Sequence, residues 1–296
     1  MDLKDINIAT CFVDDSKGFW DGFWERRNGL GAAPHSADPD SASPALRAYH
    51  QALWSRTLPN GEAMDLQKGK GSDYLTWNGM RFASDSIATQ HRYIKCAEVI
   101  HQAEQQVENY HQFVYDTTRF TYTMGGMIIF PKLRGSMNQD RGTNPYISDR
   151  WDLTLECIKR YYGQPENDNR QFNPLWKTIK RSEEFFNLFV DFNGYIGFFF
   201  LQDFVDGNGN VIRFMPDYFD GNRNFTKKYP VPQTAVEYLQ NIETQKSIIA
   251  KRNARIQRFV QTQNGKMLST GGKTCRPIFN RVFQLWLEDM PLRGIR

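Results

Sequence analysis

Two carboxylates at helical spacing stand out between residues 149 and 160. Asp152 and Glu156 lie four residues apart, so a helix would place both on one face, where they could act as general acid and base. Arg141 and Arg150 lie close by in the sequence and bring guanidinium groups of the kind that bind phosphate. We interpret the carboxylates as candidate catalytic residues and the arginines as candidate phosphate ligands. The alternative is a solvated helix face held by ion pairs between neighbouring turns.

A second charged pattern follows near residue 250. Lys251, Arg255 and Arg258 recur at a spacing that forms a basic stripe on one helix face, and such a stripe can follow a phosphate backbone. The opposite face carries isoleucines seven residues apart, namely Ile242, Ile249 and Ile256. The alternative is an ordinary amphipathic helix whose charged face is solvated.

Three further polar residues complete the candidate site. His50 is a second acid–base candidate, and Ser84 and Asp85 are expected to line a polar pocket with it. The pair Gly125 and Gly126 indicates a bulge or a close approach of another backbone or a ligand.

We expect no metal and no cofactor. The five histidines show no pair at the spacing of a helical metal site. Asp206, Asn208 and Asn210 resemble the start of a calcium loop, but Val211 stands where that loop needs glycine, so we expect a hairpin turn.

The elements that would position these residues can be read from caps and turns. Ser43 and Pro44 predict a helix start, and Asn78-Gly79 predicts a turn between strands. The other expected elements are a helix capped by Asp85 or Ser86 that reaches about residue 110, a strand or hairpin at 120–130, a polar loop at 132–143, a helix at 149–162, and a helix of about 30 residues capped by Thr234.

These elements favour an α+β class, a predominantly helical single domain with a small antiparallel or mixed sheet. We expect an N-terminal extension at 1–37, a main domain at 38–262, and a C-terminal extension at 263–296 packed on the main domain. The chain has 40% hydrophobic residues and a net charge of +4, which excludes a disordered chain and makes any nucleic-acid binding depend on local charge clusters.

Several strings within residues 38–260 resemble a bacterial protein family that is classed as a domain of unknown function. The strings are SPALRAYHQALWS from residue 43, ASDSI from 83, MGGMIIFP from 124, DRWDLTLECI from 149, GY at 194 with FFLQD from 199, and RNARI from 252. The resemblance implies no activity.

We therefore hold two hypotheses for the function. The first is a bacterial, cytoplasmic enzyme that acts on nucleic acid or a nucleotide, in a phage-defence or toxin module. The second is a non-enzymatic interaction protein whose long C-terminal helix binds a partner or a second copy. The longest apolar run has seven residues, so no membrane association is expected, and the four separated cysteines are expected to be reduced thiols.

Overall fold

The structure is a computed structural model and describes residues 1–20, 22–23, 38–70, 74–88, 93–132, 136–215, 219–220 and 223–269. It confirms the α+β class with helix predominating. The described segments contain one four-stranded antiparallel sheet, and its strands follow one another in the order of the sequence. The strands are β1 (Gln67–Lys68), β2 (Leu75–Trp77), β3 (Met80–Ser86) and β4 (Met127–Pro131).

The hairpin between β2 and β3 turns at Asn78 and Gly79, as predicted. Their φ angles of 49° and 78° are the left-handed values that a tight two-residue turn requires. β3 then pairs with β4, which places Ser84 opposite Ile129. Every residue of β4 is buried, in keeping with its uninterrupted apolar sequence.

Two short helices precede the sheet, α2 (Pro39–Ala42) and α3 (Pro44–Trp54). Ser43 caps α3 as predicted, because its Oγ accepts a hydrogen bond from the backbone N–H of Leu46 at 3.0 Å. Pro44 occupies the first turn, where its missing N–H has no consequence. α3 buries Tyr49, His50, Leu53 and Trp54 against the body of the protein.

The predicted helix capped by Asp85 or Ser86 is wrong. Both residues belong to β3, where Asp85 pairs with Ile128 and Ser86 with Met127. The helical structure that follows is divided into α4 (Tyr93–Glu104) and α5 (Tyr110–Thr121). Asn109 starts α5 anew by accepting a hydrogen bond from the N–H of Gln112 at 3.2 Å.

The predicted polar loop at 132–143 is also wrong in large part. α6 (Met137–Thr143) occupies its second half, because Met137 and Arg141 lie four residues apart and are both buried. The helix predicted at 149–162 is confirmed as α7 (Trp151–Gly163). The helices that follow α7 are α8 (Trp176–Arg181), α9 (Glu183–Asn187) and α10 (Phe192–Phe198). Single 3₁₀ turns occur at η1 (Leu3–Asp5), η3 (Met124–Gly126) and η4 (Gln202–Phe204).

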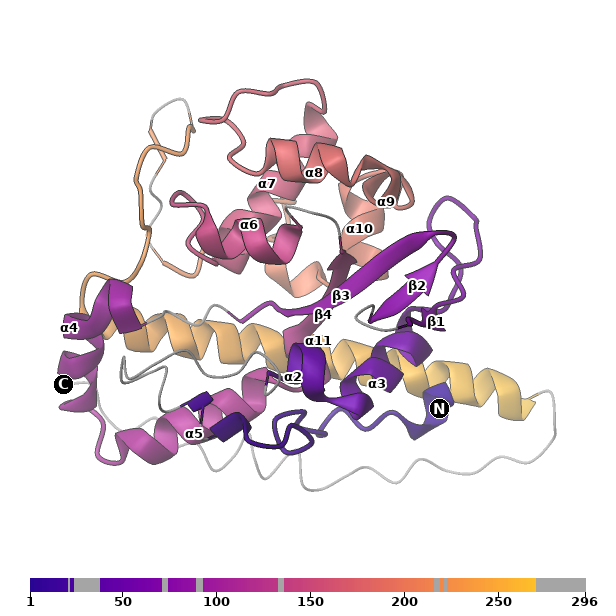
Figure 1. Ribbon diagram of the computed structural model, residues 1–296, viewed down its shortest axis with the longest axis horizontal. Helices are drawn as coiled ribbons and strands as arrows, with labels where there is room; N and C mark the ends of the chain where they lie inside the picture. Colours follow the sequence, from indigo (N-terminus) through magenta and orange to yellow (C-terminus); the bar gives the residue numbers. More distant parts are fainter. Residues whose placement is uncertain are drawn as a thin grey trace.

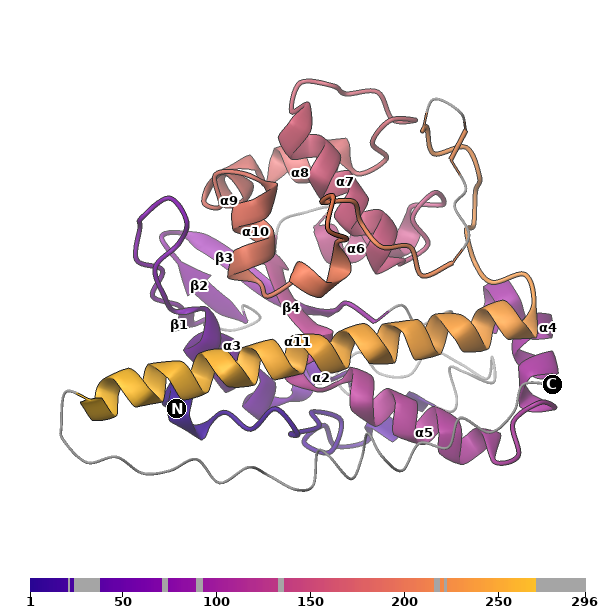
Figure 2. The ribbon, with the colours of Figure 1, turned by 180° about the vertical axis from the view of Figure 1, so that it is seen from behind.

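The long helix α11 (Ala235–Ser269) crosses the whole molecule and divides it into two layers (Figure 1). The sheet and α6 to α10 lie on one side, whereas α5 and the N-terminal segment lie on the other, and the view from behind shows the same division (Figure 2). Thr234 begins the helix as predicted, because its Oγ1 accepts from the N–H of Glu237 at 3.1 Å.

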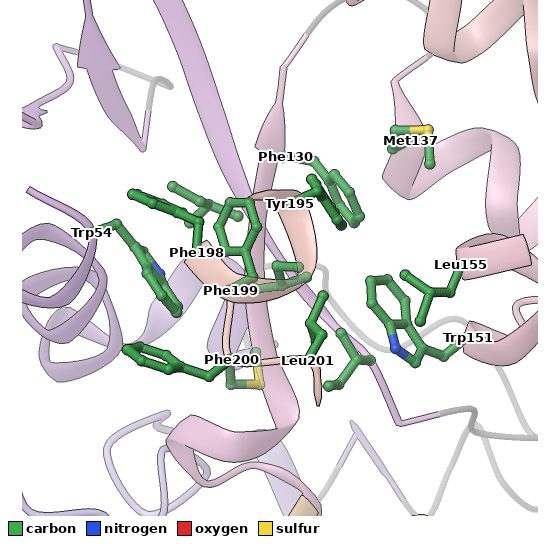
Figure 3. Close-up of a cluster of buried hydrophobic side chains, with 14 of the residues drawn as sticks. Trp54, Phe130, Met137, Trp151, Leu155, Tyr195, Phe198, Phe199, Phe200 and Leu201 are labelled. Carbon is green, nitrogen blue, oxygen red and sulfur yellow. The ribbon is translucent and has the colours of Figure 1, made fainter. Parts of the chain in front are cut away.

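An aromatic core fills the space between the layers. The end of α10 and the turn after it place Phe198, Phe199 and Phe200 near Trp54 of α3, while Leu201 points towards Trp151 of α7 (Figure 3). The rings of Trp54 and Phe199 meet edge to face at 5.1 Å. Three further phenylalanines are buried in the same core, namely Phe185, Phe186 and Phe189.

The N-terminal segment shares this core, through Ile6, Phe12 and Phe19. The predicted C-terminal extension at 263–296 lies outside the described residues, except for the last turns of α11. The division of the chain into these parts therefore stays a prediction. No helix among the described segments combines the length and the apolar character that crossing a membrane requires.

Candidate functional site

A line of buried hydrogen bonds joins α3, β3 and α2. Trp54 Nε1 donates to His50 Nδ1 at 2.8 Å, and His50 Nε2 lies 3.1 Å from Ser84 Oγ. Ser84 Oγ in turn donates to Asp40 Oδ1 at 2.9 Å. Helical spacing places Trp54 four residues after His50, and the pairing of β3 with β4 fixes Ser84 beside them. The sequence predicted that His50 and Ser84 lie close together, and this geometry agrees with that prediction.

The donor character of the indole fixes the tautomer of His50. An indole N–H can only donate, so Nδ1 of His50 is the unprotonated nitrogen and Nε2 carries the proton. Burial, with the positive charge of Arg252 adding to it, lowers the pKa of His50 to about 3, so the ring is neutral near pH 7. In this arrangement the lone pair on Nδ1 of His50 accepts the hydrogen bond from Trp54. The N–H at Nε2 donates to Ser84 Oγ, which directs the Ser84 hydroxyl towards Asp40.

Two carboxyl groups beside Ser84 have raised pKa values. Burial raises the pKa of Asp40 well above its usual value, and the negative charges of Asp38 and Asp85 raise it further. Burial also raises the pKa of Asp85 to about 6, although the charge of Arg141 acts against it. A carboxyl with a pKa of about 6, such as Asp85, can hold and release a proton near neutral pH, which is a common property of catalytic acids and bases.

Arg141 joins β3 to the segment in front of α7, and it is fully buried at 0% exposure. Its Nη1 donates to a carboxylate oxygen of Asp85 and, at 3.1 Å, to the carbonyl of Ser86. Its Nη2 lies 3.3 Å from Asp149 Oδ1, and its Nε donates to Thr154 Oγ1 at 3.1 Å. A phosphate at Arg141, as the sequence predicted, would have to displace these partners. We call the group Asp40, His50, Ser84, Asp85, Arg141 and Asp149 the Ser84 centre.

The carboxylate of Asp152 belongs to a different cluster. Arg150 Nε donates to Asp152 Oδ1 at 3.0 Å, and its Nη2 donates to Oδ2 in a two-point pair. Asp152 Oδ2 also accepts from the backbone N–H of Phe214 at 3.1 Å, which ties the segment after residue 205 to α7. Burial would raise the pKa of Asp152, but the charge of Arg150 and these hydrogen bonds outweigh it and lower the pKa.

Glu156 occupies the next turn of α7 and is also fully engaged. Its Oε1 accepts from Arg160 Nε at 2.8 Å, and its Oε2 accepts from Arg213 Nη2 at 3.1 Å. The guanidinium of Arg160 lies over the ring of Phe225 at 4.9 Å. Burial would raise the pKa of Glu156, but Arg213 and Arg160 together lower it.

We call these paired residues the α7 cluster, comprising Arg150, Asp152, Glu156, Arg160 and Arg213. The four members on or next to α7, Arg150, Asp152, Glu156 and Arg160, are buried, so this face of α7 is not a solvated one. They contact Arg213, Phe214 and Phe225 of the same chain. It meets the Ser84 centre at Thr154, whose Oγ1 accepts from Arg141 and donates to the carbonyl of Arg150 at 2.8 Å. The sequence grouped both sets as one site, whereas the structure places them in two adjoining networks.

The predicted basic stripe of α11 is in part exposed. Lys251 and Arg258 face solvent, and neither forms an ion pair with a described carboxylate. Arg255 is half-buried and binds Asp203 in a two-point pair, with Nη2 donating to Oδ1 at 3.0 Å. Two of the three stripe residues are thus available to a ligand.

The turn at Asp206 uses its carboxylate internally. Asp206 Oδ1 accepts from the N–H groups of Asn208 and Asn210 at 2.9 and 2.8 Å, and Gly209 has a φ of 73°. The predicted hairpin turn is confirmed, with Val205 bridged to Val211. Across the part of the chain that the structure describes, no three His, Cys, Asp or Glu side chains come together in a way that could hold a metal ion.

Two residues of these networks, Asp40 and Arg213, were not singled out from the sequence as parts of a site. Asp40 follows Asp38 and Pro39, a cap followed by proline that signals the start of α2. Arg252 is buried at 0% exposure and binds the carbonyls of Phe199, Gly125 and Met127. Arg213 comes from an irregular segment, and no local pattern indicates its partner.

Comparison with family models places the chain in a known family. The model of the family of unknown function DUF6994 matches residues 6–256, so the chain belongs to this family. The match includes most of the segment 1–37 that was expected to lie outside the common body. No curated protein and no solved structure matches the chain.

Proposed function

We propose that the protein is an enzyme in which Asp40 and Asp85 transfer protons beside Ser84. The observation that carries the proposal is the hydrogen bond from Ser84 Oγ to Asp40, a carboxyl whose pKa is raised by burial and by the charge of Asp85. A carboxyl with a raised pKa is a stronger base than an ordinary aspartate, and its protonated form can return the proton as an acid.

The roles within the Ser84 centre follow from the contacts. Asp40 is the candidate base, since its carboxylate accepts the hydrogen bond that the Ser84 hydroxyl donates. His50 positions Ser84 through its Nε2, and Arg141 holds Asp85 on the other side of the strand. This assignment replaces Glu156 and Asp152 as the preferred acid–base pair, because both are saturated by arginines that lower their pKa values.

The proposed substrate is a nucleotide or a nucleic acid. Two exposed cations of α11, Lys251 and Arg258, support this class, because unpaired basic side chains on one helix face can bind phosphates. Arg141 and Arg150 do not add to this support, since their guanidinium groups are buried among carboxylates. The bacterial, cytoplasmic setting in a defence or toxin module belongs to the same proposal.

The alternative of a partner-binding helix has less support. Ile249 and Ile256 of the isoleucine seam are buried, at 1% and 0% exposure, by other parts of the same chain. A partner that used this seam would have to displace the body of the protein from α11. The interaction hypothesis would therefore need a different surface.

The test is the activity of the Asp40→Asn variant on nucleotides, RNA and single-stranded DNA. Asparagine has the shape of the protonated aspartate, so the variant should fold normally while its rate falls at least about 100-fold. Ser84→Ala should also lose activity if the hydroxyl takes part in the reaction.

The matched control is Asp116→Asn, which makes the same chemical change at an exposed position of α5. It should retain the wild-type rate. Full activity in Asp40→Asn, or no turnover of any of these substrates by the wild type, would contradict the proposal.

A further inference from the structure

A groove of about 440 Å³ opens beside the N-terminal segment. It is lined by Val13, Asp14, Ser16, Lys17, Gly18, Phe19, Trp20 and, from α5, Tyr115. Its volume falls within the range of about 300–1,000 Å³ that is usual for small-molecule sites. None of these residues belongs to the Ser84 centre or to the α7 cluster.

Two aromatic rings form one wall of the groove. Trp20 and Tyr115 stack with their centroids 4.4 Å apart and their planes at 28°. Phe19 meets Trp20 edge to face at 5.2 Å, and Arg119 Nη1 donates to the hydroxyl of Tyr115 at 3.0 Å. The two rings are therefore fixed by neighbours before any ligand arrives, which reduces the entropy lost on binding.

The rim of the groove carries an unused cation. Lys17 is exposed and has no ion pair or hydrogen bond with any described residue. Asp14 is different, because Arg119 Nη2 donates to its Oδ2 at 2.7 Å and neutralises its charge. Trp20 and Tyr115 cover one face of each other, so together they form a rigid aromatic wall. Such a wall next to a free lysine matches a ligand that combines a planar ring with a negative charge.

The groove is tied to the element that carries Asp40. Asp15 Oδ2 accepts from Ser43 Oγ and from the N–H of Ala45, both at 2.9 Å. Ser43 directly follows α2 as its C-cap and directly precedes α3 as its N-cap. The groove segment is thus hydrogen-bonded to the residue that joins α2 to α3, and α2 carries the candidate base Asp40.

We propose that this groove binds the base of a nucleotide against the aromatic wall that the stacked pair of Trp20 and Tyr115 forms, with the phosphate at Lys17. The inference rests on the proposed function and names the part of the substrate that the groove takes. Stacking on aromatic side chains accepts any base, because every base has a planar π surface.

The experiment is a calorimetric titration of the full chain with adenosine 5′-monophosphate, adenosine and ribose 5-phosphate. Adenosine 5′-monophosphate should bind the wild type, and Trp20→Leu should weaken it at least about tenfold. Lys17→Gln should weaken adenosine 5′-monophosphate several-fold and leave adenosine unchanged. The lysine is exposed, so this second variant tests the proposal even if Trp20→Leu does not fold.

The matched controls are Trp176→Leu and Lys177→Gln on α8, which repeat both changes outside the groove and should bind as the wild type does. Equal affinity of wild type and Trp20→Leu, binding of ribose 5-phosphate as strong as that of the nucleotide, or no binding up to about 1 mM would overturn the inference. Asp40→Asn should bind the nucleotide normally. Binding at the groove without any turnover by the wild type would sink the proposed reaction and leave this site standing.

Discussion

The backbone N–H of Gly125 donates to Oδ1 of Asn253 at 2.6 Å, which fastens the turn before β4 to the middle of α11. The approach is so close that a side chain at position 125 has no room. A Cβ there would lie 2.6 Å from the carbonyl oxygen of Ile249 and 2.7 Å from Cγ of Asn253. The glycine is therefore required by the packing of two backbones, as the sequence pattern of adjacent glycines had indicated.

Gly125→Ala should lower the free energy of unfolding by about 2 kcal/mol or more, since α11 or the turn must move to admit a methyl group. Gly142→Ala is the matched control, because a Cβ at this helical glycine meets nothing within 4 Å. The control should be neutral or stabilising by up to about 1 kcal/mol. Urea denaturation of the three proteins measures the difference, and equal stability of both variants would contradict the packing argument.

Arg252→Met should be among the most destabilising changes in α11. The guanidinium donates to the carbonyls of Phe199, Gly125 and Met127 at 3.0, 2.8 and 2.8 Å, and no carboxylate of the described residues pairs with it. Methionine fills much of the volume but leaves these buried carbonyls without donors, at about 1–3 kcal/mol for each unsatisfied group. The expected loss in the free energy of unfolding is about 3 kcal/mol or more.

Arg258→Met makes the same change on the exposed side of α11, two turns further along the helix. It should alter the free energy of unfolding by less than about 0.5 kcal/mol. If the two variants unfold at the same denaturant concentration, the carbonyls do not depend on Arg252.

The elements that could be predicted are those whose signals are local. α7 follows from apolar residues at helical spacing, and α3 follows from the adjacent cap and proline at Ser43 and Pro44. Asp85 and Ser86 were misread because the same residue types suit a helix cap and a strand end. What decides between them is pairing with Ile128 and Met127, about forty residues away, and such pairing leaves no mark in the local sequence.

The candidate site shows the same limit. His50 and Ser84 meet as expected, whereas Asp85, the next residue of β3, is bound by Arg141 on the other side of the strand. Asp152 and Glu156 were grouped with them because they share a helix face, but that face turns towards Arg213 and the backbone of Phe214. A helical pattern shows which residues share a face and says nothing of what covers it.

Asp85→Asn should flatten the pH dependence of stability between about pH 4 and pH 7. The pKa of Asp85 rises from its usual value to about 6 in the folded protein, mainly through burial. Ionisation is therefore harder in the folded than in the unfolded state, so the stability present below about pH 4 is lost as pH rises through 6. The wild type should lose about 2–3 kcal/mol over this window relative to the variant.

The measurement is the difference in unfolding free energy between wild type and Asp85→Asn at several pH values. Taking the difference matters because His50 acts in the opposite direction, since its pKa of about 3 makes folding less favourable as pH falls below its usual value. Asp40, Asp149 and Arg141 also face Asp85 and are present in both proteins. Asp116→Asn is the exposed control, and a difference that stays constant with pH would refute the assignment.

Glu156→Gln separates a structural role of the α7 cluster from a catalytic one. Glu156 binds Arg160 with one carboxylate oxygen and Arg213 with the other, and the neutral amide can accept only on its one oxygen. Both guanidinium groups then lose their charged partner, and one of them also loses its hydrogen-bond acceptor, which should lower the free energy of unfolding by about 1–3 kcal/mol. The change should leave the rate per folded molecule within about threefold of the wild type, because the Ser84 centre is untouched.

Glu108→Gln repeats the substitution at an exposed position and should be neutral in both stability and rate. Thermal unfolding and the activity assay, run on the same preparations, give the two readouts for each variant. A stable Glu156→Gln protein without activity would move the chemistry back to α7, where the spacing of the carboxylates first suggested it.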